Sequence, residues 1–146
     1  MTASNVTLKN LRLLVIDDED FIRRLIVRVL YDLEIDGVIE ARDGIEALKF
    51  VKMAPTGFDA IICDLEMPNM NGIDFVRQLR GDANVSISRT PVLILTGHSM
   101  EGKIKEVVEL GIHGFLAKPV SKGTLEKRLI DAVTSPPIDP KVLNRG

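Results

Sequence analysis

The chain has 146 residues, of which 45% are apolar and only 4% aromatic, so one domain with a core of leucine, isoleucine and valine is expected. The net charge of −2 argues against a nucleic-acid-binding surface, and a single cysteine excludes an internal disulfide. No apolar run is long enough to span a membrane and the N-terminus lacks the pattern of a signal peptide, so we expect a cytoplasmic protein.

Two strand–helix pairs are predicted in the first part of the chain. The run 11–16 is almost continuously apolar, as in a buried central strand, and 19–33 follows it with helical spacing. The more polar run 36–41 suits an edge strand, and Asp43 with Glu46 indicates a capped helix start there. The apolar side of the first helix is expected to hold Ile22, Leu25, Ile26, Val29, Leu30 and Leu33, with Arg23, Arg24 and Arg28 on a solvated face.

Three more pairs complete the alternation, with Asn71, Ser99 and Ser121 as the expected helix starts. A glycine at 111 is a plausible end for the fourth helix. Five strands in strict alternation with helices predict a doubly wound α/β fold, a parallel sheet covered on both faces. The third, fourth and fifth strands are 58–63, 91–96 and 112–117. The helices that follow the second to fifth strands are 43–53, 71–80, 99–111 and 121–133.

Polar side chains stand at the carboxyl ends of four predicted strands. Asp17 and Asp18 follow the first strand and Asp64 follows the third, while Thr96 ends the fourth and Lys118 follows the fifth. The carboxyl ends of parallel strands share one edge of the sheet, where open α/β proteins bind their ligands. Each residue alone could be an ordinary helix cap or strand end, but the coincidence on four strands favours a site.

Three carboxylates in one place imply a partner of opposite charge. Two unit charges about 4 Å apart repel by roughly 4 kcal/mol at an effective dielectric constant near 20. Uptake of protons would relieve this repulsion, and so would a hard divalent cation such as Mg²⁺. With Mg²⁺ and Lys118 nearby, a phosphate is the natural ligand, and Asp64 could attack phosphorus as a nucleophile. His98 and His113 lack a matched nucleophile, and no Walker-type glycine loop is present.

These motifs, in this order, resemble the receiver domain of response regulators in two-component signalling. "DD", "D", "T", "K-P" and the loop "MPNMNG" all occur between Leu11 and Val133, and "IRRLIVRVL" and "DLEMPNMNG" are similar to chemotaxis-type single-domain receivers. The resemblance implies a flavodoxin-like (βα)5 fold with sheet order 2-1-3-4-5. It divides the chain into an N-terminal extension (1–10), a receiver domain (11–134) and a proline-containing, extended or mobile tail (135–146).

The resemblance also implies which residues bind metal and phosphate. Asp64 matches the phospho-acceptor, and Asp17 and Asp18 match the acidic pair that serves Mg²⁺, with Asp18 as the more direct ligand. The backbone carbonyl of Glu66 takes the position of a further metal ligand.

A second set of residues matches the family's switch. Thr96 corresponds to the switch hydroxyl, Lys118 to the lysine that contacts the phosphoryl group, and Phe115 to the switch aromatic. Pro119 follows Lys118 through a peptide bond that is usually cis in the family.

Two residues that flank the site differ from the chemotaxis protein. Glu66 stands two residues after Asp64, where that protein has asparagine, and His98 stands two residues after Thr96, where it has glutamate. Both are expected to modulate the lifetime of the phosphoryl group, and Glu66 could pair with Lys118 in the resting state.

The predicted function is that of a single-domain phospho-acceptor rather than an enzyme. A sensor histidine kinase or histidine phosphotransfer protein would donate the phosphoryl group, and the surface formed by 99–110, 112–117 and 121–133 would then signal to a protein target or pass the phosphate on. Neither a nucleic acid nor a membrane is expected as a partner. One alternative is an interaction module of the same fold that is not phosphorylated. The other, a haloacid-dehalogenase-type phosphatase, is disfavoured because "DLE" replaces its D-x-D pattern.

Overall fold

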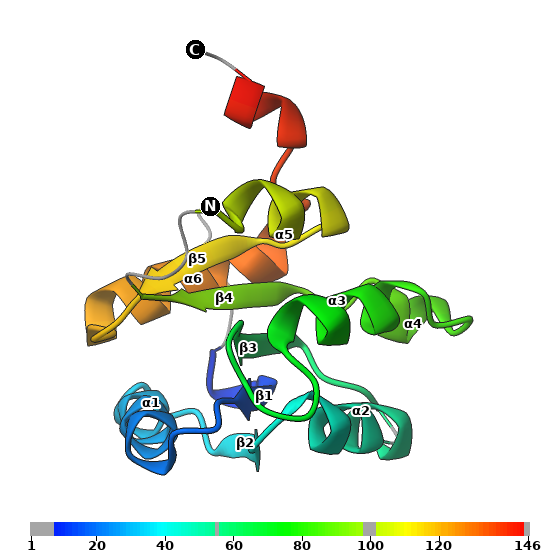
Figure 1. The fold of residues 1–146 in the computed structure, drawn as a ribbon. Coiled ribbons are helices and arrows are strands. Elements are labelled where there is room, and N and C mark those ends of the chain that lie inside the picture. Colours follow the sequence, from blue (N-terminus) through cyan, green and yellow to red (C-terminus); the bar gives the residue numbers. More distant parts are fainter. Residues whose placement is uncertain (1–7, 55, 98–101, 145–146) are drawn as a thin grey trace.

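A computed structural model describes residues 8–54, 56–97 and 102–144. Five parallel strands form one sheet in the order β2-β1-β3-β4-β5, which confirms the predicted fold (Figure 1). The strands are β1 (Arg12–Ile16), β2 (Gly37–Ala41), β3 (Ala60–Asp64), β4 (Val92–Thr96) and β5 (Gly114–Ala117). The helices are α1 (Asp20–Asp32), α2 (Gly44–Met53), α3 (Gly72–Arg80), α4 (Val85–Ser88), α5 (Ile104–Leu110) and α6 (Lys122–Thr134), with the 3-10 turns η2 (Leu8–Asn10) and η4 (Pro140–Asn144).

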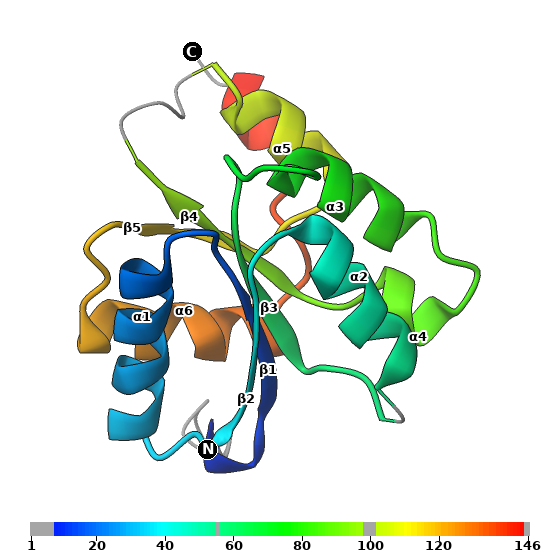
Figure 2. The ribbon, with the colours of Figure 1, turned by 60° about the horizontal axis from the view of Figure 1, so that its bottom comes forward.

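The helices cover the sheet on both faces, because alternate residues of each buried strand point to opposite sides (Figure 2). On one side Leu14 and Ile61 pack with α2, α3 and α5. On the other side Leu13 and Ile62 pack with α1 and α6. The sheet therefore has two apolar layers, and its polar residues are left at the strand ends.

The strand register brings the polar strand ends to one level. Ile16, the last residue of β1, pairs with Cys63 of β3, so Asp17 and Asp64 follow neighbouring residues of the sheet. Thr96 at the end of β4 pairs with Ala117, and Lys118 comes next. One edge of the sheet thus carries Asp17, Asp64, Thr96 and Lys118, whereas Phe115 lies within β5.

The predicted helix starts are confirmed wherever the structure describes them. Asp43 accepts a hydrogen bond from the backbone N–H of Glu46 at 2.9 Å, and Asn71 and Ser121 cap α3 and α6 in the same way. Gly111 ends α5 with a φ of 96°, a left-handed conformation that favours glycine. The predicted start at Ser99 lies outside the described residues.

One expectation about the helices is wrong, and one short helix was not predicted. The buried side of α1 includes Arg23 and Val27, whereas Leu25 is exposed, so the helix is rotated from the predicted orientation. The short helix α4 was not predicted at all. It forms because the side chain of Asn84 accepts a hydrogen bond from the backbone N–H of Ser86, a local cap in a stretch with little apolar periodicity.

The C-terminal tail was predicted to be extended or mobile, and this is wrong for residues 138–144. The backbone N–H of Ile138 donates to the carbonyl of Ile112 at 2.8 Å, and the Ile138 side chain packs against the core. Asp139 then caps η4 by accepting from the N–H of Lys141 at 2.9 Å. Figures 1 and 2 show η4 next to α5, with which it is in contact.

His113, just before β5, should make the stability of the fold sensitive to acid. Burial lowers its pKa from 6.5 to about 4, and the nearby charge of Arg80 acts in the same direction. Its Nδ1 atom accepts a hydrogen bond from the N–H of Val92 at 3.3 Å, so the neutral ring fits this position. Because the folded pKa is the lower one, the stabilisation is present above pH 6.5 and is lost as the pH falls towards 4.

We expect the free energy of unfolding to fall by about 2–3 kcal/mol between pH 7 and pH 4.5 through His113 alone. His113→Asn keeps an acceptor near the Nδ1 position but has no proton to gain, so this component should disappear. Denaturant unfolding of both proteins at the two pH values measures the difference. Parallel pH profiles for the two proteins would contradict the assignment to His113.

Candidate functional site

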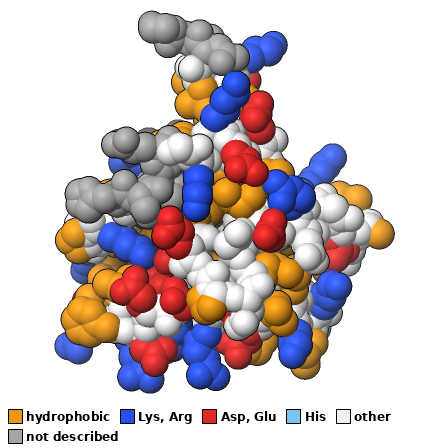
Figure 3. Space-filling view, viewed as in Figure 1, with side chains coloured by type: hydrophobic (Ala, Val, Ile, Leu, Met, Phe, Trp, Pro, Cys, Tyr) orange, Lys and Arg blue, Asp and Glu red, His pale blue; other side chains and the backbone are white. Residues whose placement is uncertain are grey.

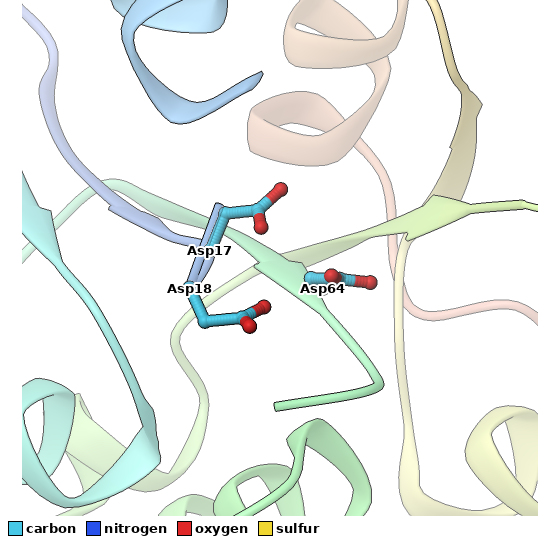
Figure 4. Close-up of side chains that lie close together, drawn as sticks. All are labelled: Asp17, Asp18 and Asp64. Atoms are coloured by element: carbon cyan, nitrogen blue, oxygen red, sulfur yellow. The ribbon is translucent and has the colours of Figure 1, made fainter. Parts of the chain in front are cut away.

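Three carboxylates meet at the carboxyl edge of the sheet. Oxygen atoms of Asp17, Asp18 and Asp64 all lie within 4.8 Å of one another, and the three side chains point in the same direction (Figure 4). Asp17 is fully buried and Asp64 nearly so, whereas Asp18 is exposed. Figure 3 shows acidic side chains gathered beside α1 on this face of the molecule. The predicted convergence of these residues is thus present in the structure.

Lys118 lies in the same cluster and supplies its positive charge. Its Nζ atom is 3.2 Å from Oδ2 of Asp64, 3.5 Å from Oδ2 of Asp17 and 3.8 Å from Oε1 of Glu19. The Lys118–Pro119 peptide bond is cis, as the resemblance to the receiver family implied. The backbone N–H of Lys118 donates to the carbonyl of Thr96 at 3.1 Å, which ties the lysine to the end of β4.

Burial shifts the ionisation of the three central groups. It raises the pKa of Asp17 to about 6, and it also raises the pKa of Asp64, although Lys118 acts against the shift. For Lys118, burial alone would lower the pKa, but the charges of Asp64 and Asp17 outweigh it and the pKa is raised. Burial thus makes the charged forms of Asp17 and Asp64 harder to keep, and the single nearby lysine acts against this for both carboxyls.

One buried carboxylate oxygen at the site lacks a hydrogen bond within the part of the chain that the structure describes. Oδ2 of Asp17 is buried and finds no hydrogen-bond partner among the described residues, although the ammonium group of Lys118 lies 3.5 Å away. Oδ1 of the same carboxylate accepts from the N–H of Glu19 at 3.0 Å. A buried, unsatisfied carboxylate oxygen beside those of Asp18 and Asp64 is a suitable ligand set for a hard cation, and this set of donors fits Mg²⁺.

Thr96 ends β4 at the carboxyl edge of the sheet, and Phe115 lies on the neighbouring strand β5. The hydroxyl of Thr96 donates to the backbone carbonyl of Leu116 at 3.3 Å, so it is held against β5. Phe115 is half-buried and packs against the core cluster on the α3 and α5 side of the sheet. Any movement of the Thr96 hydroxyl towards Asp64 would break its bond to β5.

Glu66 has a different partner from the one expected. Its side chain is exposed, and Oε1 lies 3.5 Å from Nζ of Lys103 at the start of α5, whereas Lys118 pairs with Asp17, Glu19 and Asp64. The backbone N–H groups of Leu65 and Glu66 lower the pKa of the Asp64 carboxyl, against the effect of burial. The prediction for His98 falls outside the described residues.

Arg23 is a residue of this region whose place the sequence analysis missed. It was expected on a solvated face, but it is 6% exposed and its Nη1 atom donates to the backbone carbonyl of Asp17 at 2.9 Å. A helical spacing of four and seven residues places Arg23 on the same side as Val27 and Leu30, both of which are buried. That spacing was the available signal, but the positive charge of arginine argued against burial.

Comparisons with known proteins agree with this geometry. Residues 13–130 match the family model described as the response regulator receiver domain. The chemotaxis protein CheY-3 of Vibrio cholerae is 34% identical over 83% of this chain and 90% of its own length. The structure of the chemotaxis response regulator CheY4 of Vibrio cholerae is 36% identical, covers 82% of this chain and 95% of its own, and has a TM-score of 0.71.

A third relative was solved with a metal ion. The receiver domain of a Pseudomonas aeruginosa sensor histidine kinase, with magnesium coordinated in its active-site cleft, is 26% identical. The match covers 86% of this chain and 98% of that chain, with a TM-score of 0.75.

The chain belongs to the response-regulator receiver family. It is therefore a receiver-type phospho-acceptor of two-component signalling, similar to chemotaxis proteins of the CheY type, rather than an enzyme that acts on a separate substrate. This confirms the predicted family and the prediction of a phospho-acceptor rather than an enzyme. Family membership also implies a histidine kinase as a partner. Within the described ranges, no helix is both long and apolar enough to cross a membrane.

Proposed function

We propose that this protein accepts a phosphoryl group on Asp64 from a phosphohistidine of a sensor kinase or a histidine phosphotransfer protein. The observation that carries the proposal is the position of the Asp64 carboxylate, 3.2 Å from Lys118 and within 4.8 Å of Asp17 and Asp18. Asp64 ends its strand at the carboxyl edge of the sheet, and its side chain is 12% exposed. We assign this activity to a receiver domain of residues 11–134 in the cytoplasm.

The transfer itself needs little from the protein beyond position and charge. A carboxylate oxygen of Asp64 forms a bond to phosphorus as the bond from phosphorus to the donor imidazole breaks, and that nitrogen takes a proton from solvent. The product is an acyl phosphate. Lys118 offsets negative charge on the transferring group, and the N–H groups of Leu65 and Glu66 also favour the anionic form of the Asp64 carboxyl by lowering its pKa.

The acidic cluster supports a role for Mg²⁺ in this reaction. Asp17, Asp18 and Asp64 would hold the ion together with the backbone carbonyl of Glu66, and Asp18 is the most accessible of the three carboxylates. When bound, Mg²⁺ neutralises charge on the phosphoryl oxygens. The unsatisfied oxygen of Asp17 would gain a partner at the same time.

Phosphorylation would change the balance of hydrogen bonds around Thr96. A phosphoryl group on Asp64 is a charged acceptor and therefore a stronger one than the Leu116 carbonyl that Thr96 now contacts. Transfer of this hydrogen bond would release the end of β5 and alter the packing next to Phe115. The surface formed by α5, β5 and α6 would then change shape and signal to a protein target, or the phosphoryl group would be passed to another histidine.

Phosphotransfer profiling tests the proposal. The purified protein is incubated with each histidine kinase of its source organism, phosphorylated beforehand, and separately with acetyl phosphate, in the presence of Mg²⁺. Rapid labelling by one kinase is the expected result. If neither a kinase nor the small phosphodonor labels the protein, the interaction module that is not phosphorylated becomes the better description.

Glu66 should influence how long the phosphoryl group persists. In Glu66→Asn the first-order rate of phosphoryl loss is expected to change several-fold, because a charged side chain next to the acyl phosphate and its pair with Lys103 are both removed. The measurement is the decay of labelled protein after the donor has been removed. Glu106→Gln is the matched control, since it removes an acid of α5 that pairs with Arg77, and its decay rate should equal that of the wild type. A wild-type decay rate for Glu66→Asn would contradict the role of this residue.

A further inference from the structure

Arg23 is a charged residue that is buried next to the acidic cluster. It lies in the first turn of α1, and its guanidinium donates hydrogen bonds to three different segments of the chain. Nη1 donates to the backbone carbonyl of Asp17 at 2.9 Å, Nη2 to Oδ1 of Asp20 at 2.7 Å and Nε to Oε1 of Glu40 at 2.8 Å. The arginine thus joins the end of β1, the start of α1 and the end of β2.

The hydrogen bond from Arg23 to the Asp17 carbonyl takes the place of a backbone hydrogen bond of the sheet. β1 ends at Ile16, and the N–H of Asp17 still donates to the carbonyl of Ala41 on β2 at 3.1 Å. The carbonyl of Asp17 lies beyond the paired residues, and Arg23 binds it instead. This carbonyl belongs to the same planar peptide group as the N–H of Asp18, so the orientation of one determines where the backbone of the other lies.

We propose that Arg23 is a positioning residue for the Asp17–Asp18 pair, which it holds in the orientation that binds Mg²⁺ together with Asp64. The proposal rests on the proposed role of Mg²⁺ at this site. A carboxylate pair that is already oriented loses less freedom when the ion binds, so it binds more tightly. Loss of a residue that supports metal ligands typically reduces affinity about 10–100-fold.

The sign of the effect separates positioning from simple electrostatics. A positive charge close to a cation site repels the cation, so removal of Arg23 would tighten Mg²⁺ binding if charge alone mattered. A positioning role predicts the opposite, weaker binding. Arg23→Lys keeps the charge, but a single ammonium group does not reproduce the planar fork that reaches three acceptors. Arg24 is the neighbouring residue on the same helix and is exposed, so Arg24→Met serves as the matched control.

The test measures Mg²⁺ affinity by isothermal titration calorimetry for the wild type, Arg23→Lys, Arg23→Met and Arg24→Met. All titrations are made below the unfolding midpoint of each variant, so Arg23→Lys decides the outcome if Arg23→Met does not fold. We expect both Arg23 variants to bind about tenfold more weakly or worse. Arg24→Met should bind as the wild type does or slightly more tightly.

Labelling by acetyl phosphate provides a second measurement. Arg23→Lys should need more Mg²⁺ to reach its half-maximal rate, and the rate at saturating Mg²⁺ should return towards that of the wild type. Wild-type Mg²⁺ affinity in Arg23→Lys, or a labelling defect that persists at saturation, would overturn the positioning role and leave the proposed function intact. Absence of Mg²⁺ binding by the wild type would overturn both the positioning role of Arg23 and the proposed function.

Discussion

Asp64→Asn should reduce labelling by phosphohistidine and by acetyl phosphate to the background of the assay. The carboxamide has no anionic oxygen to attack phosphorus, so no acyl phosphate can form at this position. The same substitution removes one negative charge from a crowded site, where burial already raises the pKa of the Asp64 carboxyl. Lys118 keeps Asp17 and Glu19 as partners. Labelling is followed with a radioactive or mass-shifted phosphoryl group.

A control keeps this result separate from loss of the fold. Asp74→Asn is the same chemical change on the exposed surface of α3, where Asp74 pairs with Arg77, and its labelling should equal that of the wild type. The thermal midpoint of Asp64→Asn should not fall, because relief of carboxylate repulsion offsets the loss of one contact to Lys118. Labelling of the variant at the wild-type rate would show that another residue is the acceptor.

Gly72→Ala is expected to have the largest effect on stability. A Cβ atom at position 72 would lie far inside van der Waals contact with the carbonyl oxygen of Asp64 and 2.8 Å from Cα of Leu65. Both neighbours are backbone atoms, and the N–H of Gly72 donates to the carbonyl of Leu65 at 2.8 Å, so neither side can move freely. We expect a loss of about 3 kcal/mol or more in the free energy of unfolding.

Gly72→Ala should also disturb the site, because the backbone that must shift to accept the new Cβ atom carries Asp64. Denaturant unfolding measures the stability, and Mg²⁺ titration of the folded variant measures the change at the site. Gly123→Ala, in the first turn of α6 with no atom within 4 Å of the new Cβ, is the control and should gain about 0.5–1 kcal/mol. Equal stability of the two variants would show that the backbone around Gly72 can shift more easily than its contacts indicate.

The sheet and the site could be predicted because both follow from short-range patterns. Apolar runs alternate with helical spacing, and the strand ends carry Asp17, Asp64 and Lys118, so a parallel sheet brings them together without further information. Arg23 was misplaced although its helical spacing to Val27 and Leu30 indicated the buried side, because its charge argued against burial and its acceptors come from β2 and from the end of β1. For the same reason, the sequence did not show that Glu66 pairs with Lys103, since that contact joins segments far apart in the chain.

The docked C-terminal tail affects where the protein can be truncated or tagged. Because Ile138 packs into the core and η4 lies against α5, truncation at the family boundary near residue 130 would uncover apolar surface beside Ile112. An affinity tag or fluorescent fusion at the C-terminus would start from the flank of the surface that is proposed to carry the signal. Binding assays with such fusions should therefore be repeated with a cleaved or N-terminal tag before a missing interaction is attributed to the phosphorylation state.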